Sequence, residues 1–111
     1  MRKPVTRKII VSFRIERKAL QLIDLKSRNR SLVMRDAINH LIHEGITKDD
    51  IIAVALSIPA DKKKQTSVKI NEEMLDGLKR IAEENQIHMS ELIRIAIWKH
   101  LMKEAVGVKP Q

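Results

Sequence analysis

Residues 65–70, QTSVKI, form a strand-like run between a basic cluster and the start of a helix. Threonine and valine favour an extended backbone, and the two-residue period of a strand puts Thr66, Val68 and Ile70 on one face. The other face then carries the polar side chains of Gln65, Ser67 and Lys69. The stretch therefore predicts a strand with one buried and one exposed face.

The same alternation occurs earlier in the chain, in IVSFRI at residues 10–15. Here Val11, Phe13 and Ile15 alternate with Ser12 and Arg14, which predicts a first strand over residues 9–15. After each strand, two successive stretches have apolar residues at helical spacing. The predicted helices run from about residue 17 to 27, from 30 to 45, from 72 to 85 and from 89 to 106, with Asn29 or Ser31 and Asn71 as candidate caps.

The two halves of the chain align as an internal repeat. Superposing SFRIE on SVKIN shifts the numbering by 55, whereas superposing RSLVMRDAI on MSELIRIAI shifts it by 59. The difference equals about one helical turn, so the first helix of the first copy is predicted to be one turn shorter.

Composition limits the function. At 111 residues with 43% hydrophobic residues, the chain can bury a core but leaves little room for an enzyme cleft. The net charge of +8 and pI near 10.1 predict an anionic partner, either nucleic acid or an acidic membrane surface. Residues 1–35 hold eleven Lys/Arg against two acidic residues, which disfavours a merely solvated lysine-rich surface.

The sequence contains no cysteine, no secretory signal and no apolar run of membrane-spanning length, so we expect a soluble, cytoplasmic protein. Phe13 and Trp98 are its aromatic residues among Phe, Trp and Tyr, too few for the stacking platforms of single-strand and most RNA binders.

Residues 46–64 connect the halves and contain a helix of their own. Thr47 followed by Asp49 and Asp50 is typical of a helix start, and Pro59 ends the apolar run IIAVALSI. We expect this helix, residues 48–57, to bury most of its circumference against the body of the protein or another copy. The predicted organisation is a basic arm (1–8), a first unit (9–45), this linker (46–64), a second unit (65–106) and a tail (107–111).

A second apolar stripe distinguishes the last helix. Ile95, Trp98 and Met102 occupy positions where the first copy is polar, and they lie apart from the core stripe. Either the linker helix covers this stripe or it forms a subunit interface. Both alternatives predict that Trp98 is buried.

His40, His43 and Glu44 have a spacing that suits a metal, but exposed histidines near a helix C-terminus are the favoured interpretation. The acidic residues Glu72 and Glu73 suit the start of a helix, without a nucleophile pattern beside them. We therefore predict no metal, no cofactor, no small-molecule ligand and no enzymatic activity.

Both halves resemble the ribbon-helix-helix fold of the Arc and methionine repressors. The resemblance lies in TSVKINEEMLDGLKRIAEEN and MSELIRIAI in the second half, and in SFRIERKAL and NRSLVMRDAI in the first. It implies a mainly helical protein in which two strands pair antiparallel and enter the DNA major groove above four helices. The base-reading positions would be Ile10, Ser12, Arg14, Gln65, Ser67 and Lys69. Arg14 suits guanine and Gln65 adenine, whereas Ile10 either contacts a thymine methyl group or marks a strand that reads less.

The resemblance also implies that the start of each unit's second helix binds a DNA phosphate, as a helix N-terminus can. The corresponding residues are Asn29, Arg30 and Ser31 in the first copy and His88, Met89 and Ser90 in the second. Met89 stands where the family commonly has arginine, which predicts a weaker second contact. Further phosphate contacts are expected from Arg7, Lys8, Lys62, Lys63 and Lys64.

The sequence thus predicts a transcription regulator, repressor or activator, that binds double-stranded DNA sequence-specifically and self-associates on it. We expect the two units to pair within one chain, with Arg14 beside Lys69, the alternative being an intermolecular dimer. The other function classes left open are an antitoxin-like protein-interaction module and a non-specific basic architectural binder.

Overall fold

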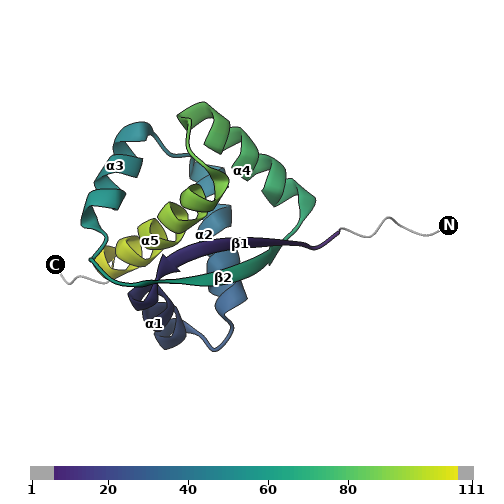
Figure 1. Ribbon diagram of the computed structural model, residues 1–111. Helices are drawn as coiled ribbons and strands as arrows, with labels where there is room; N and C mark the ends of the chain where they lie inside the picture. The colour runs from purple at the N-terminus through teal and green to yellow at the C-terminus, as the bar shows by residue number, and fades with distance from the viewer. Residues whose placement is uncertain (1–6, 108–111) are drawn as a thin grey trace.

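The chain forms a two-stranded ribbon laid over helices in the computed structural model, which describes residues 7–107 and the side chains of residues 7–103. The elements follow the order β1 (Ile9–Glu16), α1 (Arg17–Lys26), α2 (Arg30–Glu44), α3 (Lys48–Ser57), β2 (Lys63–Ile70), α4 (Glu72–Asn85) and α5 (Met89–Gly107). In Figure 1 the two strands cross the front, with α2 and α5 behind them and α1 and α4 on either side. Of the expected arm and tail, residues 1–6 and 108–111 lie outside the described part.

The two strands pair antiparallel within this one chain. Ser12 lies opposite Ser67 at the middle of the ribbon, with Arg14 opposite Gln65 towards one end and Ile10 opposite Lys69 towards the other. The expectation that Arg14 lies beside Lys69 is therefore wrong. An antiparallel register moves aligned residues of the two halves to opposite ends of the ribbon, so they lie opposite each other at its middle, as Ser12 and Ser67 do, but not at its ends.

The core lies between the ribbon and the helices. The inward faces of the strands bury Phe13, Ile15, Val68 and Ile70, as the alternation predicts. The helices complete the core, and their fully buried side chains include Ile23, Met34, Ile38, Leu78, Leu92, Ile93, Ile95 and Ile97. A two-stranded ribbon is marginally stable alone, so this packing supports the outward face.

Most helix boundaries agree with the sequence. The first helix has 10 residues and α4 has 14, which confirms the expected difference of one turn. Asn29 caps α2 and Asn71 caps α4, each accepting a backbone hydrogen bond through its side chain. The second strand begins two residues earlier than expected, because Lys63 and Lys64 continue the ladder opposite Glu16 and Ile15.

The linker helix differs from expectation in its burial. It spans Lys48–Ser57 as predicted, with a capping box between Thr47 and Asp50, and it packs against α5. Val54 is its buried side chain, whereas Leu56 is 82% exposed and Ile52 56% exposed. Within one chain α3 therefore does not bury most of its circumference, because a helix lying on a small body contacts it along one side. The alternative that another copy covers the remaining surface stays a prediction.

Candidate nucleic-acid interface

The outward face of the ribbon gathers all six residues expected to read bases. Five of them, Ser12, Arg14, Gln65, Ser67 and Lys69, are exposed polar side chains, while the sixth, Ile10, is 63% exposed. The register arranges these side chains as three cross-strand pairs in the order Arg14–Gln65, Ser12–Ser67 and Ile10–Lys69. The face is thus mostly polar, with one apolar side chain near one end.

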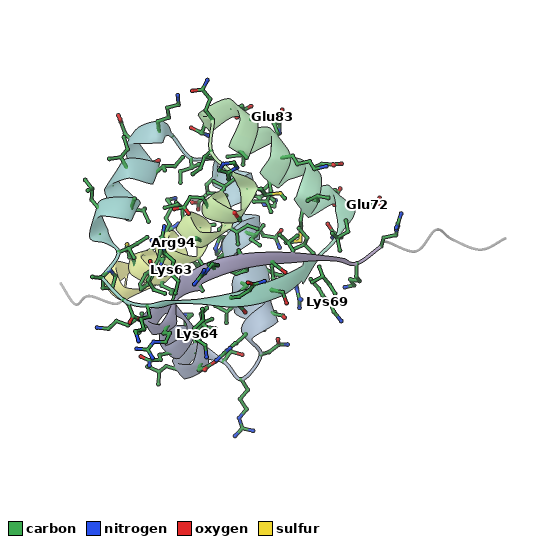
Figure 2. The ribbon with its side chains drawn as sticks, in the orientation of Figure 1. Lys63, Lys64, Lys69, Glu72, Glu83 and Arg94 are labelled. Carbon is green, nitrogen blue, oxygen red and sulfur yellow. The ribbon has the colours of Figure 1, made fainter. Side chains whose placement is uncertain are left out.

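The basic cluster in front of β2 divides between the two faces of the ribbon. Strand periodicity puts Lys63 on the face of Gln65, whereas Lys64 shares the parity of Thr66 and points the other way. Figure 2 shows Lys63 and Lys64 at one end of the ribbon and Lys69 towards the other. Arg7 and Lys8, directly before β1, are exposed as well.

The start of α5 adjoins one end of this face. Ser12, Arg14, Lys63, Gln65, Ser90 and Glu91, together with Phe13, line a hollow of about 380 Å³. Ser90, expected to contact phosphate, therefore lies beside side chains expected to contact bases. His88 is exposed and Met89 half-buried just ahead of it.

The starts of α2 and α5 differ in charge. Glu91 lies in the first turn of α5 and pairs with Arg94, whereas α2 has Leu32 at the equivalent position. Asn29 uses its side chain to accept from the Leu32 amide at 3.2 Å, which is ordinary capping. Arg30 is paired with Asp24, its Nε lying 2.8 Å from Oδ1, and this hydrogen bond raises the pKa of Arg30 and lowers that of Asp24.

A buried polar cluster that the sequence did not predict lies beneath the end of β1. Glu16, at the end of β1, is 3% exposed and accepts hydrogen bonds from Arg94 at 2.6 Å and from the Trp98 indole at 2.9 Å. Burial raises the pKa of Glu16, but the hydrogen bonds from Arg94 and Trp98 outweigh it and hold the pKa below the ordinary value. The cluster links β1 to α5.

The apolar stripe of α5 is covered. Ile95 is 1% exposed and Trp98 3%, which confirms that Trp98 is buried, while Met102 is half-buried. Both β1 and α3 pack against α5. The Glu16 carboxylate explains how the indole N–H is satisfied in the core, which buried tryptophan usually requires.

The histidines form a pair that sequence spacing did not reveal. His40 Nδ1 of α2 lies 3.2 Å from His100 Nδ1 of α5. Burial lowers the pKa of His100, and the charges of His40, Lys26 and Lys103 act in the same direction while Asp36 opposes them. Within residues 7–107, no group of three or more His, Cys, Asp or Glu side chains is arranged to hold a metal ion.

A two-stranded antiparallel ribbon above paired helices defines the architectural class, and the comparison with known families agrees with it. Residues 64–104 match the ribbon-helix-helix protein family, copG family, which supports a ribbon-helix-helix domain over β2, α4 and most of α5. Members of this family typically bind DNA, as transcription regulators or antitoxins, and it is not a family of enzymes. The match leaves out β1, α1, α2 and α3.

No curated protein and no solved structure gave a significant match to the chain. Across residues 7–107, every helix is too short or too polar to cross a membrane.

Proposed function

We propose that this protein is a sequence-specific transcription regulator that inserts its ribbon into the major groove of double-stranded DNA. The observation that carries the proposal is the outward face of the ribbon, which presents exposed polar side chains while Phe13, Ile15, Val68 and Ile70 of the inward face are buried in the core. The B-DNA major groove is wide enough for a two-stranded ribbon, and each base pair presents a distinct pattern there.

The chemistry of the face fits base reading. Arg14 can donate two hydrogen bonds to guanine, and the Gln65 amide can pair with adenine in the same way. Ser12 and Ser67, at the middle, accept or donate with either kind of base. These contacts supply specificity, whereas contacts to phosphate supply most of the affinity.

The phosphate contacts are assigned to the flanks of the ribbon. Arg7, Lys8 and Lys63 are exposed beside it, and Ser90 lines the hollow next to Arg14. Lys62, Lys64 and the helix starts at residues 29–31 and 88–90 complete the set. We expect α2 to bind phosphate more strongly than α5, because the negative charge of Glu91 disfavours an anion at the start of α5.

We further propose that the two units act as tandem ribbon-helix-helix copies that pair within one chain. The pairing of β1 with β2 and the Glu16–Arg94 contact between the halves support this arrangement. An intermolecular dimer remains the rival arrangement. Sedimentation at low protein concentration distinguishes them, since obligate dimers would contradict pairing within one chain.

The test of function is binding to duplexes selected from a random library, with random DNA as competitor. Arg14→Ala and Lys69→Ala should each relax discrimination at one end of the site by about 1–3 kcal/mol. The matched control is Lys79→Ala on α4, which removes a similar exposed charge outside the ribbon. Equal competition by random DNA would identify a non-specific architectural binder and refute the proposal.

One observation favours a second candidate, an antitoxin-like protein-interaction module. Leu56 and Ile52 leave an apolar surface on α3. The same surface could serve self-association on DNA. The test compares the unaltered protein with Ile52→Ser and Leu56→Ser. If one protein molecule binds each site, and if neither variant changes the DNA affinity or the preferred spacing between sites, self-association through α3 is contradicted.

A further inference from the structure

The three cross-strand pairs of the ribbon differ in chemistry from one end to the other. Arg14 and Gln65 form a pair of hydrogen-bonding side chains, whereas Ile10 and Lys69 combine an apolar group with an ammonium group. The equivalent of Ile10 in the second strand is Gln65, so the pseudo-symmetry of the ribbon fails at this position. Because its two ends differ, the ribbon can distinguish the two orientations of a DNA site.

The spacing of the pairs matches DNA. Alternate residues of a strand are about 6.8 Å apart, and base pairs rise by about 3.4 Å, so successive pairs lie roughly two base pairs apart. The ribbon from Ile10 to Arg14 then covers about four base pairs. Each end therefore faces its own base pairs, and the serines face the middle.

The exposed side chain of Ile10 needs an apolar group to pack against when the ribbon lies on DNA. It is 63% exposed on a face that is otherwise polar, and the cationic residues Lys69 and Lys8 flank it. These charges favour DNA over an apolar protein partner. The apolar group that base edges carry in the major groove is the C5-methyl group of a pyrimidine, as thymine bears.

On the basis of the proposed function, we propose that the ribbon reads a directional, non-palindromic core. Ile10 packs against the methyl group of a 5-methylpyrimidine at one end, and Arg14 with Gln65 hydrogen-bonds to purines at the other. The 5-methylpyrimidine is supplied by thymine or by 5-methylcytosine. Lys69 donates to a neighbouring base acceptor at the Ile10 end.

The first experiment selects preferred duplexes from a random library with the full chain. The inference expects a core whose two ends differ and which binds in one orientation. A palindromic core would overturn the inference and leave the proposed function standing. Recovery of no preferred sequence would instead refute the proposed function.

The second experiment changes single methyl groups in the selected duplex. Replacing thymine by deoxyuridine at the Ile10 end should weaken binding about fourfold, the effect of removing one buried methyl group, and the same change at the Arg14 end should have no effect. If the selected base is cytosine, adding its 5-methyl group should strengthen binding by about the same factor. Equal sensitivity at both ends, or none, would overturn the inference.

The variant Ile10→Gln tests the residue itself, because it replaces the apolar side chain by glutamine, the residue at the equivalent position of the second strand. It should abolish the response to the methyl group while binding remains specific. Leu25→Gln on α1 is the matched control, since Leu25 is 82% exposed outside the ribbon, and it should keep the response. Retention of the methyl response in Ile10→Gln would assign it to another residue and overturn the inference.

Discussion

The two junctions between strand and helix follow the same path with different chemistry. At the end of β2, Asn71 caps α4 locally and accepts from the Met74 amide at 2.8 Å. At the end of β1, Glu16 turns its side chain to Arg94 and Trp98, and the Lys18 amide of α1 donates instead to Asp61 at 2.8 Å. The second half thus closes its helix with a neighbouring residue, whereas the first half depends on residues far along the chain.

This difference separates two uses of a polar residue. Asn71 stabilises a single helix. Glu16 connects two halves of the molecule, and its side chain makes no capping hydrogen bond to α1. The second half, whose signals are local, is also the half that matches the family. In the first half, the junction between β1 and α1 depends instead on contacts with residues of the linker and of α5.

The largest effect is expected from Glu16→Ala. It removes the buried acceptor of the Trp98 indole and one of the two carboxylates that pair with Arg94, which should reduce the free energy of unfolding by about 3 kcal/mol. Asn71→Ala, the equivalent change in the second half, should lose about 1 kcal/mol as a cap. Urea unfolding of both variants measures the difference, and equal losses would show that the two junctions are alike.

A smaller loss of stability is expected from Asp61→Ala, which removes the remote cap of α1. The hydrogen bond from the Lys18 amide lowers the pKa of Asp61, so its contribution is present above the ordinary pKa of 3.8 and is lost as the pH falls through the lower folded value. Amide exchange should quicken in the first turn of α1. Unchanged exchange there would contradict the remote cap.

The difference in charge between the starts of α2 and α5 can be tested by exchanging the residues at positions 32 and 91. Leu32→Glu gives α2 the acidic residue of α5, and we expect it to weaken DNA binding by about 0.5 kcal/mol through repulsion of a phosphate. Glu91→Leu is the reciprocal variant and should strengthen binding by a similar amount, measured as Kd at constant salt. Strengthening by Leu32→Glu would contradict phosphate contact at α2.

The smallest effect concerns His100, which has Leu41 as its equivalent in α2. The lowered pKa of buried His100 means that its contribution to stability is complete above pH 6.5 and is lost as the pH falls through the lower folded value. His100→Leu should therefore flatten the acid side of the stability profile while preserving stability at pH 8. His43→Leu, outside the pair, is the control, and a profile unchanged by His100→Leu would assign the dependence elsewhere.

The features that the sequence predicted rest on local patterns. Alternation located both ribbon faces, Thr47 and Pro59 bounded α3, and the two alignment shifts predicted the length difference between α1 and α4. These signals work because side-chain periodicity and capping depend on near neighbours.

The features that it missed require knowledge of distant contacts. The register that puts Arg14 opposite Gln65 follows from how the halves meet, and Glu16 finds Arg94 across 78 positions of sequence. The His40–His100 pair has a separation of 60 positions. The apolar composition of α3 likewise could not reveal that one side alone would be covered.

The order in which a ribosome makes this chain gives the pairing of β1 a further consequence. The strand partners of β1 lie between residues 63 and 70, and the carboxylate that caps α1 belongs to residue 61. A nascent chain that ends before these residues exposes Phe13 and Ile15 with no strand beside them. The first unit is therefore synthesised before the residues that complete its structure, so it folds fully after the second strand has been made.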